Sequence, residues 1–289
     1  MSKKSKGLLI LLFSYIIAFV IGLLTFIILE NKLHIMVNLL ISNVVSTIVI
    51  WIIGIFFKSA SVYDPYWSIQ TPVIYLCLLI KYQNFNLGNI LFFLAILFWA
   101  IRLTYNFIKG FNDISYIDWR YKKIKETSKS FYQIVSLLGI HLVPTLVVFF
   151  ASIPSFYYVI FNNGFSFMNL IGISIMILGT LLELISDKNM HEFKKIRTSN
   201  KEIINIGLWK YSRHPNYLGE ILFWYGVALT YILSNTSHYY IILGAILNTL
   251  LFLFISIPLA ENNLRKYKEN YNEYKENTRM LLPIKKHFK

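Results

Sequence analysis

Long apolar runs dominate this sequence of 289 residues, and most are close to the roughly 20 residues that cross a bilayer as a helix. Only 15% of the residues are charged, whereas a typical soluble domain has about 25%. A chain inside a bilayer must satisfy its backbone polar groups internally, and an α-helix does so within one segment. We therefore predict an all-α integral membrane protein with about eight transmembrane helices, over residues 7–29, 35–57, 70–82, 90–108, 132–160, 167–186, 217–234 and 238–260.

Two of these runs have unusual features. The run at 132–160 is long and contains Pro144 and Pro154. Each proline removes one helical hydrogen bond, so we expect kinks there. The first run follows several lysines, as in a secretory signal peptide, but it is too long for one and no small-residue cleavage site follows it. We expect it to be a membrane helix.

Positive charge lies almost entirely on one side of the predicted bundle. If the N-terminus is cytoplasmic, 25 of the 28 Lys and Arg residues fall in cytoplasmic segments, and only Lys32 and Lys81 fall on the other side. Loops rich in Lys and Arg stay in the cytoplasm. We therefore predict a multi-pass protein of a bacterial inner membrane or the endoplasmic reticulum, with both termini and the active site facing the cytoplasm.

The formal net charge of +14 follows from this topology and from attraction to anionic lipid head groups. An anionic cofactor among the cytoplasmic loops is compatible with the same charge. No nucleic-acid-binding module is visible, so we expect no nucleic acid partner. The single cysteine, Cys77, excludes an internal disulfide, and the six histidines lack the spacing of metal ligands, so we expect no metal site.

Polar residues follow one face of the run at 90–108 and its continuation. They are spaced by four, three and four residues: Arg102, Asn106, Lys109 and Asp113. Helical geometry puts such residues in one stripe. An arginine facing lipid is costly, so this stripe should face the bundle or a polar cavity. It either joins two helices by an ion pair or forms part of a functional site.

A second polar stripe ends the run at 167–186, and its members are Glu183, Asp187, His191 and Lys194. Two carboxylates one helical turn apart repel each other unless a cation or a hydrogen-bond donor lies between them. Arg102 is one possible partner, and the hydroxyl or amino groups of a ligand are another. The third interpretation is a helix end that emerges into water.

A motif rich in polar and aromatic residues, at 207–220, follows the run at 167–186 and includes the start of the run at 217–234. Pro215 suits the first turn of a helix, where its missing N–H costs nothing. Arg213 and His214 precede it, beside free backbone N–H groups that favour phosphate or carboxylate. Asn216 and Glu220 are four residues apart, so both can face one cavity. The alternative is ordinary cationic flanking of a membrane helix.

This motif, Arg213-His214-Pro215-Asn216-Tyr217-Leu218-Gly219-Glu220, resembles that of the steroid 5-alpha-reductase-like membrane proteins and related sterol reductases. The resemblance covers about residues 60–289 and is strongest over 183–283. Its other elements are Asp118-Trp119-Arg120-Tyr121, which is similar to an element of the uncharacterised bacterial-type branch, Asp187 with Lys194, and Tyr267, Tyr274 and Pro283.

A methyltransferase branch, which binds S-adenosylmethionine, carries a similar Arg-His-Pro-x-Tyr motif. Its members usually have paired glutamates after the last span, whereas this chain has the single acid Glu261 in that stretch. The Asn216 and Glu220 pair is closer to the reductase form. The alternatives to a reductase are therefore an S-adenosylmethionine-dependent methyltransferase of a lipid or prenylated cysteine, and a non-enzymatic transporter or lipid binder.

The resemblance implies an enzyme that uses NADPH to reduce a C=C bond in a lipophilic substrate, which is a steroid-like, prenyl or fatty enone. We expect one membrane domain over residues 1–289, with N-terminal helices at 1–60, a reductase-like region at 61–289 and the cofactor site at about 183–283. The residues expected to contact the cofactor are Arg102, Asn106, Asp118, Arg120, Tyr121, Glu183, Asp187, Lys194, Trp209, Tyr211, Arg213, His214, Asn216, Tyr217, Glu220, Asn263 and Tyr267.

The reaction also needs a group that stabilises the developing enolate oxygen or supplies a proton. The segment 61–68 resembles an Asp-x-x-Trp element of the bacterial-type branch and contains Asp64 and Tyr66. Tyr217 of the motif is the third candidate. A tyrosine hydroxyl is a suitable donor, and a carboxyl would need a pKa raised by burial.

Overall fold

The computed structural model describes residues 2–161 and 164–285, and within them it consists of helices and loops, with one isolated bridge between Ser212 and Arg279. The chain forms two compact units. The first contains residues 1–74 and 103–149, and the second contains residues 75–102 and 150–289. These boundaries differ from the expected division at residue 60, which stays a prediction.

Six helical segments of the described chain are long and apolar enough to cross a membrane. This confirms the predicted all-α integral membrane fold. They are α1 (Lys3–Leu29), α2 (Ile35–Phe56), α4 (Leu87–Gly110), a continuous stretch at Trp119–Phe161, α8 (Asn169–Ile196) and a continuous stretch at Thr236–Tyr267.

The predicted runs at 70–82 and 217–234 are also helical, as α3 (Tyr66–Tyr82) and α9 (Pro215–Ile232). Neither is among the six, because α3 has only 17 residues and α9 carries buried polar groups such as Glu220. The count of eight spans and the cytoplasmic position of the termini therefore stay predictions.

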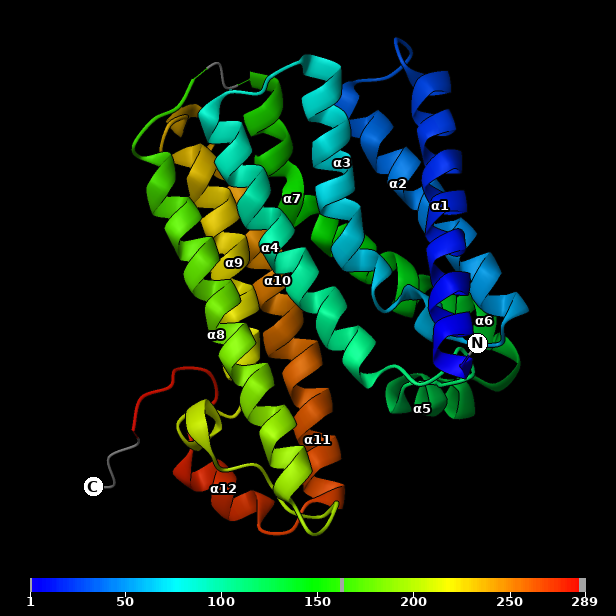
Figure 1. Ribbon diagram of the computed structural model, residues 1–289, viewed down its shortest axis with the longest axis vertical. Helices are drawn as coiled ribbons and strands as arrows, with labels where there is room; N and C mark the ends of the chain where they lie inside the picture. The colour runs from blue at the N-terminus through cyan, green and yellow to red at the C-terminus, as the bar shows by residue number, and fades with distance from the viewer. Residues whose placement is uncertain (1, 162–163, 286–289) are drawn as a thin grey trace. The chain divides into compact units, whose positions relative to one another are not determined.

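In the first unit, α1 packs along α2 (Figure 1), and the polar side chains of Asn38 and Ser46 on α2 form hydrogen bonds with α1. The Ser46 hydroxyl donates to the carbonyl of Ala18 at 3.0 Å, so its polarity is satisfied inside an apolar interface. The 3₁₀ helix η1 (Ala60–Tyr63) follows α2, and the Tyr15 hydroxyl of α1 donates to the Val62 carbonyl at 2.8 Å.

The rest of the first unit comes from the middle of the chain. It contains α5 (Trp119–Ser128), η2 (Lys129–Phe131), α6 (Tyr132–Val135), the π-helix η3 (Ser136–Leu142) and the start of α7 (Val143–Phe161). The π-helix ends directly before the turn that contains Pro144. A proline cannot donate the regular bond, so a widened turn at this point has a physical cause. Pro154 lies inside α7.

In the second unit, α8 and α9 lie side by side (Figure 1) and approach closely through glycines on both helices. A side-chain carbon at Gly179 would lie 2.6 Å from the Gly219 carbonyl oxygen and 2.8 Å from the Phe223 nitrogen. One at Gly226 would lie 2.7 Å from the Met176 nitrogen. Small residues at a helix contact let backbones meet, which is how membrane helices gain packing energy.

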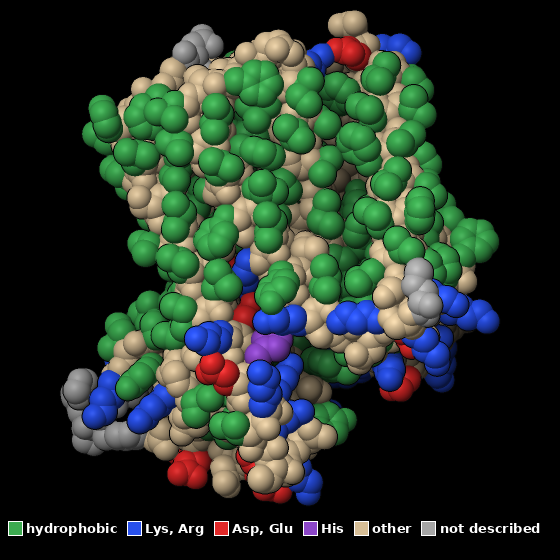
Figure 2. Space-filling model, viewed as in Figure 1, with side chains coloured by type: hydrophobic (Ala, Val, Ile, Leu, Met, Phe, Trp, Pro, Cys, Tyr) green, Lys and Arg blue, Asp and Glu red, His purple; other side chains and the backbone are tan. Residues whose placement is uncertain are grey.

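The remaining elements of the second unit follow α8 and α9 in the chain. They are η4 (Gly207–Lys210), η5 (Thr236–Ile242), α10 (Leu243–Leu251), the π-helix η6 (Phe252–Ser256), α11 (Ile257–Tyr267) and α12 (Tyr271–Asn277). Figure 2 shows hydrophobic side chains over the upper part of α8, whereas charged side chains gather around its lower end and α12.

The close contact of α8 and α9 predicts that Gly179→Ala lowers the stability of the protein by about 1–3 kcal/mol, the cost of overpacking. The added methyl group meets backbone atoms, which cannot rotate away. The measurement is thermal unfolding in detergent. Gly110→Ala is the matched control, because nothing lies within 4 Å of its added carbon. Equal melting of the two variants would contradict the close packing.

Candidate functional site

The Arg102 side chain of α4 joins the two carboxylates of the α8 stripe. Its Nε and Nη2 donate to Asp187 Oδ2 at 2.9 and 2.7 Å, and its Nη1 donates to Glu183 Oε2. Arg102 is 7% exposed and Glu183 is fully buried. Of the three interpretations of the stripe, the structure therefore shows the Arg102 pairing for these two acids. His191 adds a local contact, from its Nδ1 to the Asp187 carbonyl at 2.7 Å.

Glu220 of α9 is held by two indole groups. Trp99 of α4 donates to its Oε2 at 3.0 Å, and Trp224 of α9 donates to its Oε1 at 2.8 Å. The Trp99 ring stacks on Phe223 with a centroid distance of 4.6 Å, which fixes its orientation. Sequence reasoning did not assign these tryptophans to the site. The available signal is spacing, because Trp99 precedes Arg102 by three residues and Trp224 follows Glu220 by four.

The site on α4, α8 and α9, hereafter the acidic network, holds more carboxylates than cations. Three acidic side chains, Glu183, Asp187 and Glu220, lie with one guanidinium. The second oxygen of Glu183, Oε1, is buried and has no hydrogen-bond partner among the described residues, and neither has Asn216 Oδ1 at the start of α9. A buried acceptor without a partner costs about 1–3 kcal/mol. Groups that donate hydrogen bonds would therefore be stabilised here.

Arg213 and His214 lie against a carboxylate of the chain itself. Arg213 Nε donates to Glu261 Oε1 at 2.8 Å, and Arg213 Nη1 donates to the carbonyls of Lys275 and Thr278. His214 Nε2 lies 3.2 Å from the same Glu261 oxygen. Arg213 is 8% exposed. The structure thus places both side chains in a clasp that holds the C-terminal segment, and their contact with a cofactor phosphate stays a prediction.

The other expected cofactor residues of the second unit differ in exposure. Trp209 is buried and donates through Nε1 to the Ser186 carbonyl at 3.0 Å. Tyr217 is half-buried and stacks on His214, with a centroid distance of 5.2 Å. Asn263 is half-buried, whereas the exposed side chains are Lys194, Tyr211 and Tyr267. The structure therefore joins Tyr217 to the clasp and leaves these three exposed side chains at the surface.

The candidate residues of the first unit form two contacts. The Tyr121 hydroxyl donates to Asp64 Oδ1 at 2.5 Å, and Arg120 Nε donates to Asp118 Oδ1 at 2.8 Å at a half-exposed position. Tyr66 is buried, and its ring centroid lies 5.7 Å from that of Tyr15. Asn106 is half-buried on α4. The contact between Asp64 and Tyr121 joins two elements 57 residues apart, which spacing alone does not reveal.

The carboxyl of Asp64 has the electrostatics of a weak acid. Burial raises the pKa of Asp64 from its ordinary 3.8 to about 6, against the hydrogen bond from Tyr121 and the charge of Arg120, which both lower it. A carboxyl with such a pKa gains and loses its proton closer to neutral pH than an ordinary aspartate does, which suits a general acid.

A helical membrane bundle with a buried, hydrogen-bonded acidic network is the class of protein that the fold and the site define. The chain matches the family model described as "Protein of unknown function (DUF1295)" over residues 50–278. The chain belongs to this family, which is the steroid 5-alpha-reductase-like family, and the resemblance seen in the sequence is confirmed.

Two curated relatives share parts of the sequence. An uncharacterized protein of Schizosaccharomyces pombe is 24% identical over 65% of this chain and 62% of its own length. The 3-oxo-5-alpha-steroid 4-dehydrogenase 1 of Macaca fascicularis is 30% identical over 40% of each chain. The match thus spans less than two thirds of either relative. No solved structure matches the chain.

The Arg102 pairing predicts that Arg102→Gln destabilises the protein by about 3–5 kcal/mol, because the buried carboxylate of Glu183 and the partly buried one of Asp187 lose their cation. Thermal unfolding in detergent measures the loss. Arg120→Gln is the control, since its pair with Asp118 is half exposed and should contribute about 1 kcal/mol or less. A loss no larger than that of the control would show that the acidic network does not depend on Arg102.

The raised pKa of Asp64 predicts a pH dependence of stability. Its native pKa is above the unfolded value, so the contribution to stability is complete below about pH 4 and is lost as the pH rises through about 6. The difference is about 1–3 kcal/mol. The melting temperature of Asp64→Asn should therefore depend less on pH between pH 4 and pH 7 than that of the wild-type protein. If the melting temperatures of the wild-type protein and Asp64→Asn changed in parallel with pH, the raised pKa of Asp64 would be contradicted.

Proposed function

We propose that this protein is a membrane reductase that uses NADPH to reduce a C=C bond in a lipophilic substrate, a steroid-like, prenyl or fatty enone. The proposal is supported by membership of the family and by the similarity to a steroid 4-dehydrogenase. The structural observation that carries it is two buried acceptors without partners among the described residues, Glu183 Oε1 in the acidic network and Asn216 Oδ1 at the start of α9.

The residues of the acidic network fit the sugar and amide groups of a nicotinamide nucleotide. Hydroxyl and amide groups donate hydrogen bonds, and Glu183, Asp187, Asn216 and Glu220 offer acceptors at the start of α9 and the end of the buried part of α8. Arg102 holds two of these acids in place, and the indoles of Trp99 and Trp224 hold Glu220. The network is thus oriented before a ligand binds, which lowers the cost of binding.

The clasp of Arg213, His214 and Glu261 positions the start of α9. We assign these residues a positioning role, and we assign anion contact to exposed cations such as Lys194. When bound, the cofactor supplies the hydride. The chain's own groups hold it, exclude water and provide a proton or hydrogen bond to the substrate oxygen.

Asp64, Tyr66 and Tyr217 are the proposed donors to that oxygen. Asp64 is the one whose pKa, raised to about 6, suits proton transfer near neutral pH, and the Tyr121 hydroxyl holds its orientation. Tyr66 is buried beside Tyr15 and Tyr63, and its hydroxyl lies near the hydroxyls of α2. The positive-inside pattern places the site on the cytoplasmic side in this proposal.

One observation favours a second candidate. The acidic network carries three acidic side chains and one guanidinium, and a surplus of negative charge attracts a cation. S-adenosylmethionine has a sulfonium and an ammonium group, so a methyltransferase acting on a lipid or prenylated cysteine is the alternative.

A thermal-shift comparison of NADPH, NADH and S-adenosylmethionine tests the proposal on the purified protein in detergent. A ligand at one hundred times its Kd stabilises the native state by about 2.7 kcal/mol. We expect NADPH to raise the melting temperature and to be oxidised in the presence of a lipophilic enone. Protection by S-adenosylmethionine alone would contradict the reductase proposal and support the methyltransferase alternative.

Asn216→Ala sharpens this test. Its Oδ1 has no partner among the described residues, so its loss should not lower the stability of the ligand-free protein, whereas it should weaken NADPH binding about tenfold. Asn205→Ala, at an exposed loop position, is the control and should leave both unchanged. Wild-type affinity in Asn216→Ala would remove this side chain from the site.

A further inference from the structure

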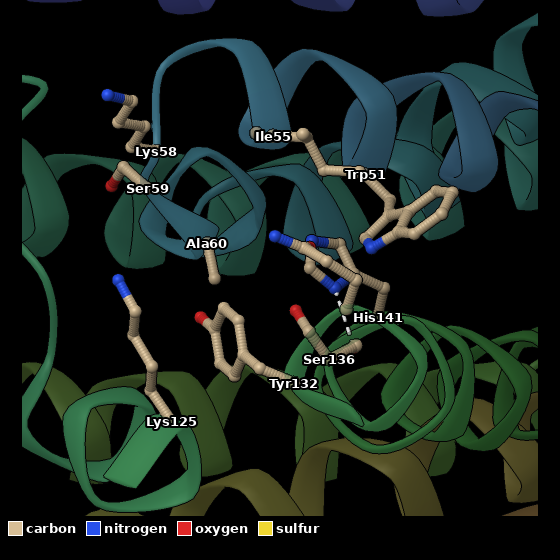
Figure 3. A pocket seen from close by; sticks show the side chains of 11 residues that line it. Trp51, Ile55, Lys58, Ser59, Ala60, Lys125, Tyr132, Ser136 and His141 are labelled. Atoms are coloured by element: carbon tan, nitrogen blue, oxygen red, sulfur yellow. Dashed lines mark hydrogen bonds between the residues drawn. The ribbon is translucent and has the colours of Figure 1, made fainter. Parts of the chain in front are cut away.

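A pocket in the first unit is lined by residues that do not belong to the proposed reductase site. It is formed by the C-terminal end of α2, the start of η1, α5, α6 and the π-helix η3, and its volume is about 410 Å³, its open mouth included. Figure 3 shows Lys58 and Lys125 on one side of it and Trp51 and His141 on the other.

The inner end of the pocket holds a donor and an acceptor that are both without partners. The His141 side chain is 1% exposed, and its Nδ1 lies 2.9 Å from the Ser136 carbonyl. A carbonyl only accepts, so Nδ1 carries the hydrogen and Nε2 of the neutral ring is an acceptor. His141 Nε2 and the indole nitrogen Trp51 Nε1 are buried without a hydrogen-bond partner among the described residues. A hydroxyl group satisfies both, because it accepts from the indole and donates to the imidazole.

The mouth of the pocket is cationic. Lys58 and Lys125 line it, and no acidic side chain of the described chain forms an ion pair with either. Lys58 follows α2 with a positive φ of 53°, and the Lys125 ammonium lies 5.7 Å from the Tyr132 ring centroid. Two ammonium groups at one mouth favour a ligand with more than one negative charge, such as a phosphate monoester.

The pocket also lies at the end of a membrane helix. Trp51 and Ile55 belong to α2, whose residues form a candidate span that ends at Phe56. Ile55 lines the pocket and is 38% exposed, and the neighbouring Phe56 is 79% exposed. Exposed apolar side chains beside a cationic mouth are the surroundings of a lipid head group and its chain.

We infer that this pocket binds a lipid phosphate monoester that carries a free hydroxyl next to its phosphate. The phosphate lies between Lys58 and Lys125, the hydroxyl lies between Trp51 and His141, and the acyl chain follows the apolar face of α2. This inference is independent of the proposed reductase activity, because it shares no residue with it.

Lysophosphatidic acid is the probe, since it has a phosphate monoester, an adjacent hydroxyl and one acyl chain. Its affinity for the purified protein in a neutral detergent is measured from the concentration dependence of the melting temperature. We expect protection by lysophosphatidic acid, and much weaker protection by glycerol 3-phosphate, which lacks the chain, and by lysophosphatidylcholine, whose phosphate is capped.

Two sets of variants locate the ligand. Lys58→Gln with Lys125→Gln should weaken binding about tenfold or more, the scale of charge-assisted hydrogen bonds. Lys122→Gln with Lys123→Gln removes the same charge from exposed positions of α5 that do not line the pocket, and should change the affinity less than about twofold. Trp51→Phe should weaken the binding of lysophosphatidic acid about fivefold. It should leave the binding of the 2-deoxy analogue unchanged, because only the hydroxyl group accepts from the indole N–H.

Three results would overturn the inference. The first is wild-type affinity in the Lys58→Gln, Lys125→Gln protein, and the second is equal weakening in the control pair. The third is equal protection by glycerol 3-phosphate or lysophosphatidylcholine, which would mean that the ligand is a soluble phosphate or that the ammonium groups do not select a monoester.

Discussion

The arrangement of the second unit depends on one buried guanidinium, that of Arg102, between Glu183 and Asp187. An unpaired charge in a helix that spans a bilayer is costly, and so is a pair of like charges one turn apart. The ion pair removes both costs and fixes α4 against α8 at one height. It also requires the glycine contact, because a side-chain carbon at Gly219 would overlap the Glu183 side chain. The close glycine contact and the buried ion pair therefore depend on each other.

The acidic network is satisfied only in part, and this separates it from a purely structural ion pair. Glu220 has two indole donors and Arg102 has two carboxylates, so these groups are settled. Glu183 Oε1 and Asn216 Oδ1 are not. Since buried acceptors normally have partners, their position indicates where the donors of a ligand or a water would be held. Acceptors left free beside side chains that are already hydrogen-bonded are what the proposed binding site requires.

The membrane helices and part of the acidic network could be predicted from the sequence, because both follow from the periodicity of nearby residues. Helical spacing put Glu183 and Asp187 on one face and gave Arg102 as a candidate partner. The long apolar runs gave the membrane helices. The contact of Arg213 with Glu261 joins residues 48 apart, and no local pattern encodes it. The local sequence also does not distinguish an arginine that pairs with a carboxylate from one that binds a phosphate, because the guanidinium suits both anions. Trp99 was predictable as a helix residue but not as a donor, since its partner lies 121 residues away.

The clasp and the acidic network differ in the sign of the charge that predominates. In the acidic network, Glu183, Asp187 and Glu220 outnumber Arg102. In the clasp, Glu261 is shared by Arg213, His214 and Lys275, and the Lys275 Nζ lies 3.1 Å from the second oxygen of Glu261. A dinucleotide has the matching asymmetry, with donor groups on its sugars and amide and negative charge on its phosphates. In the function that we propose, electrostatics directs the hydroxyl and amide groups of such a ligand toward the acidic network, and its phosphates toward exposed cations such as Lys194.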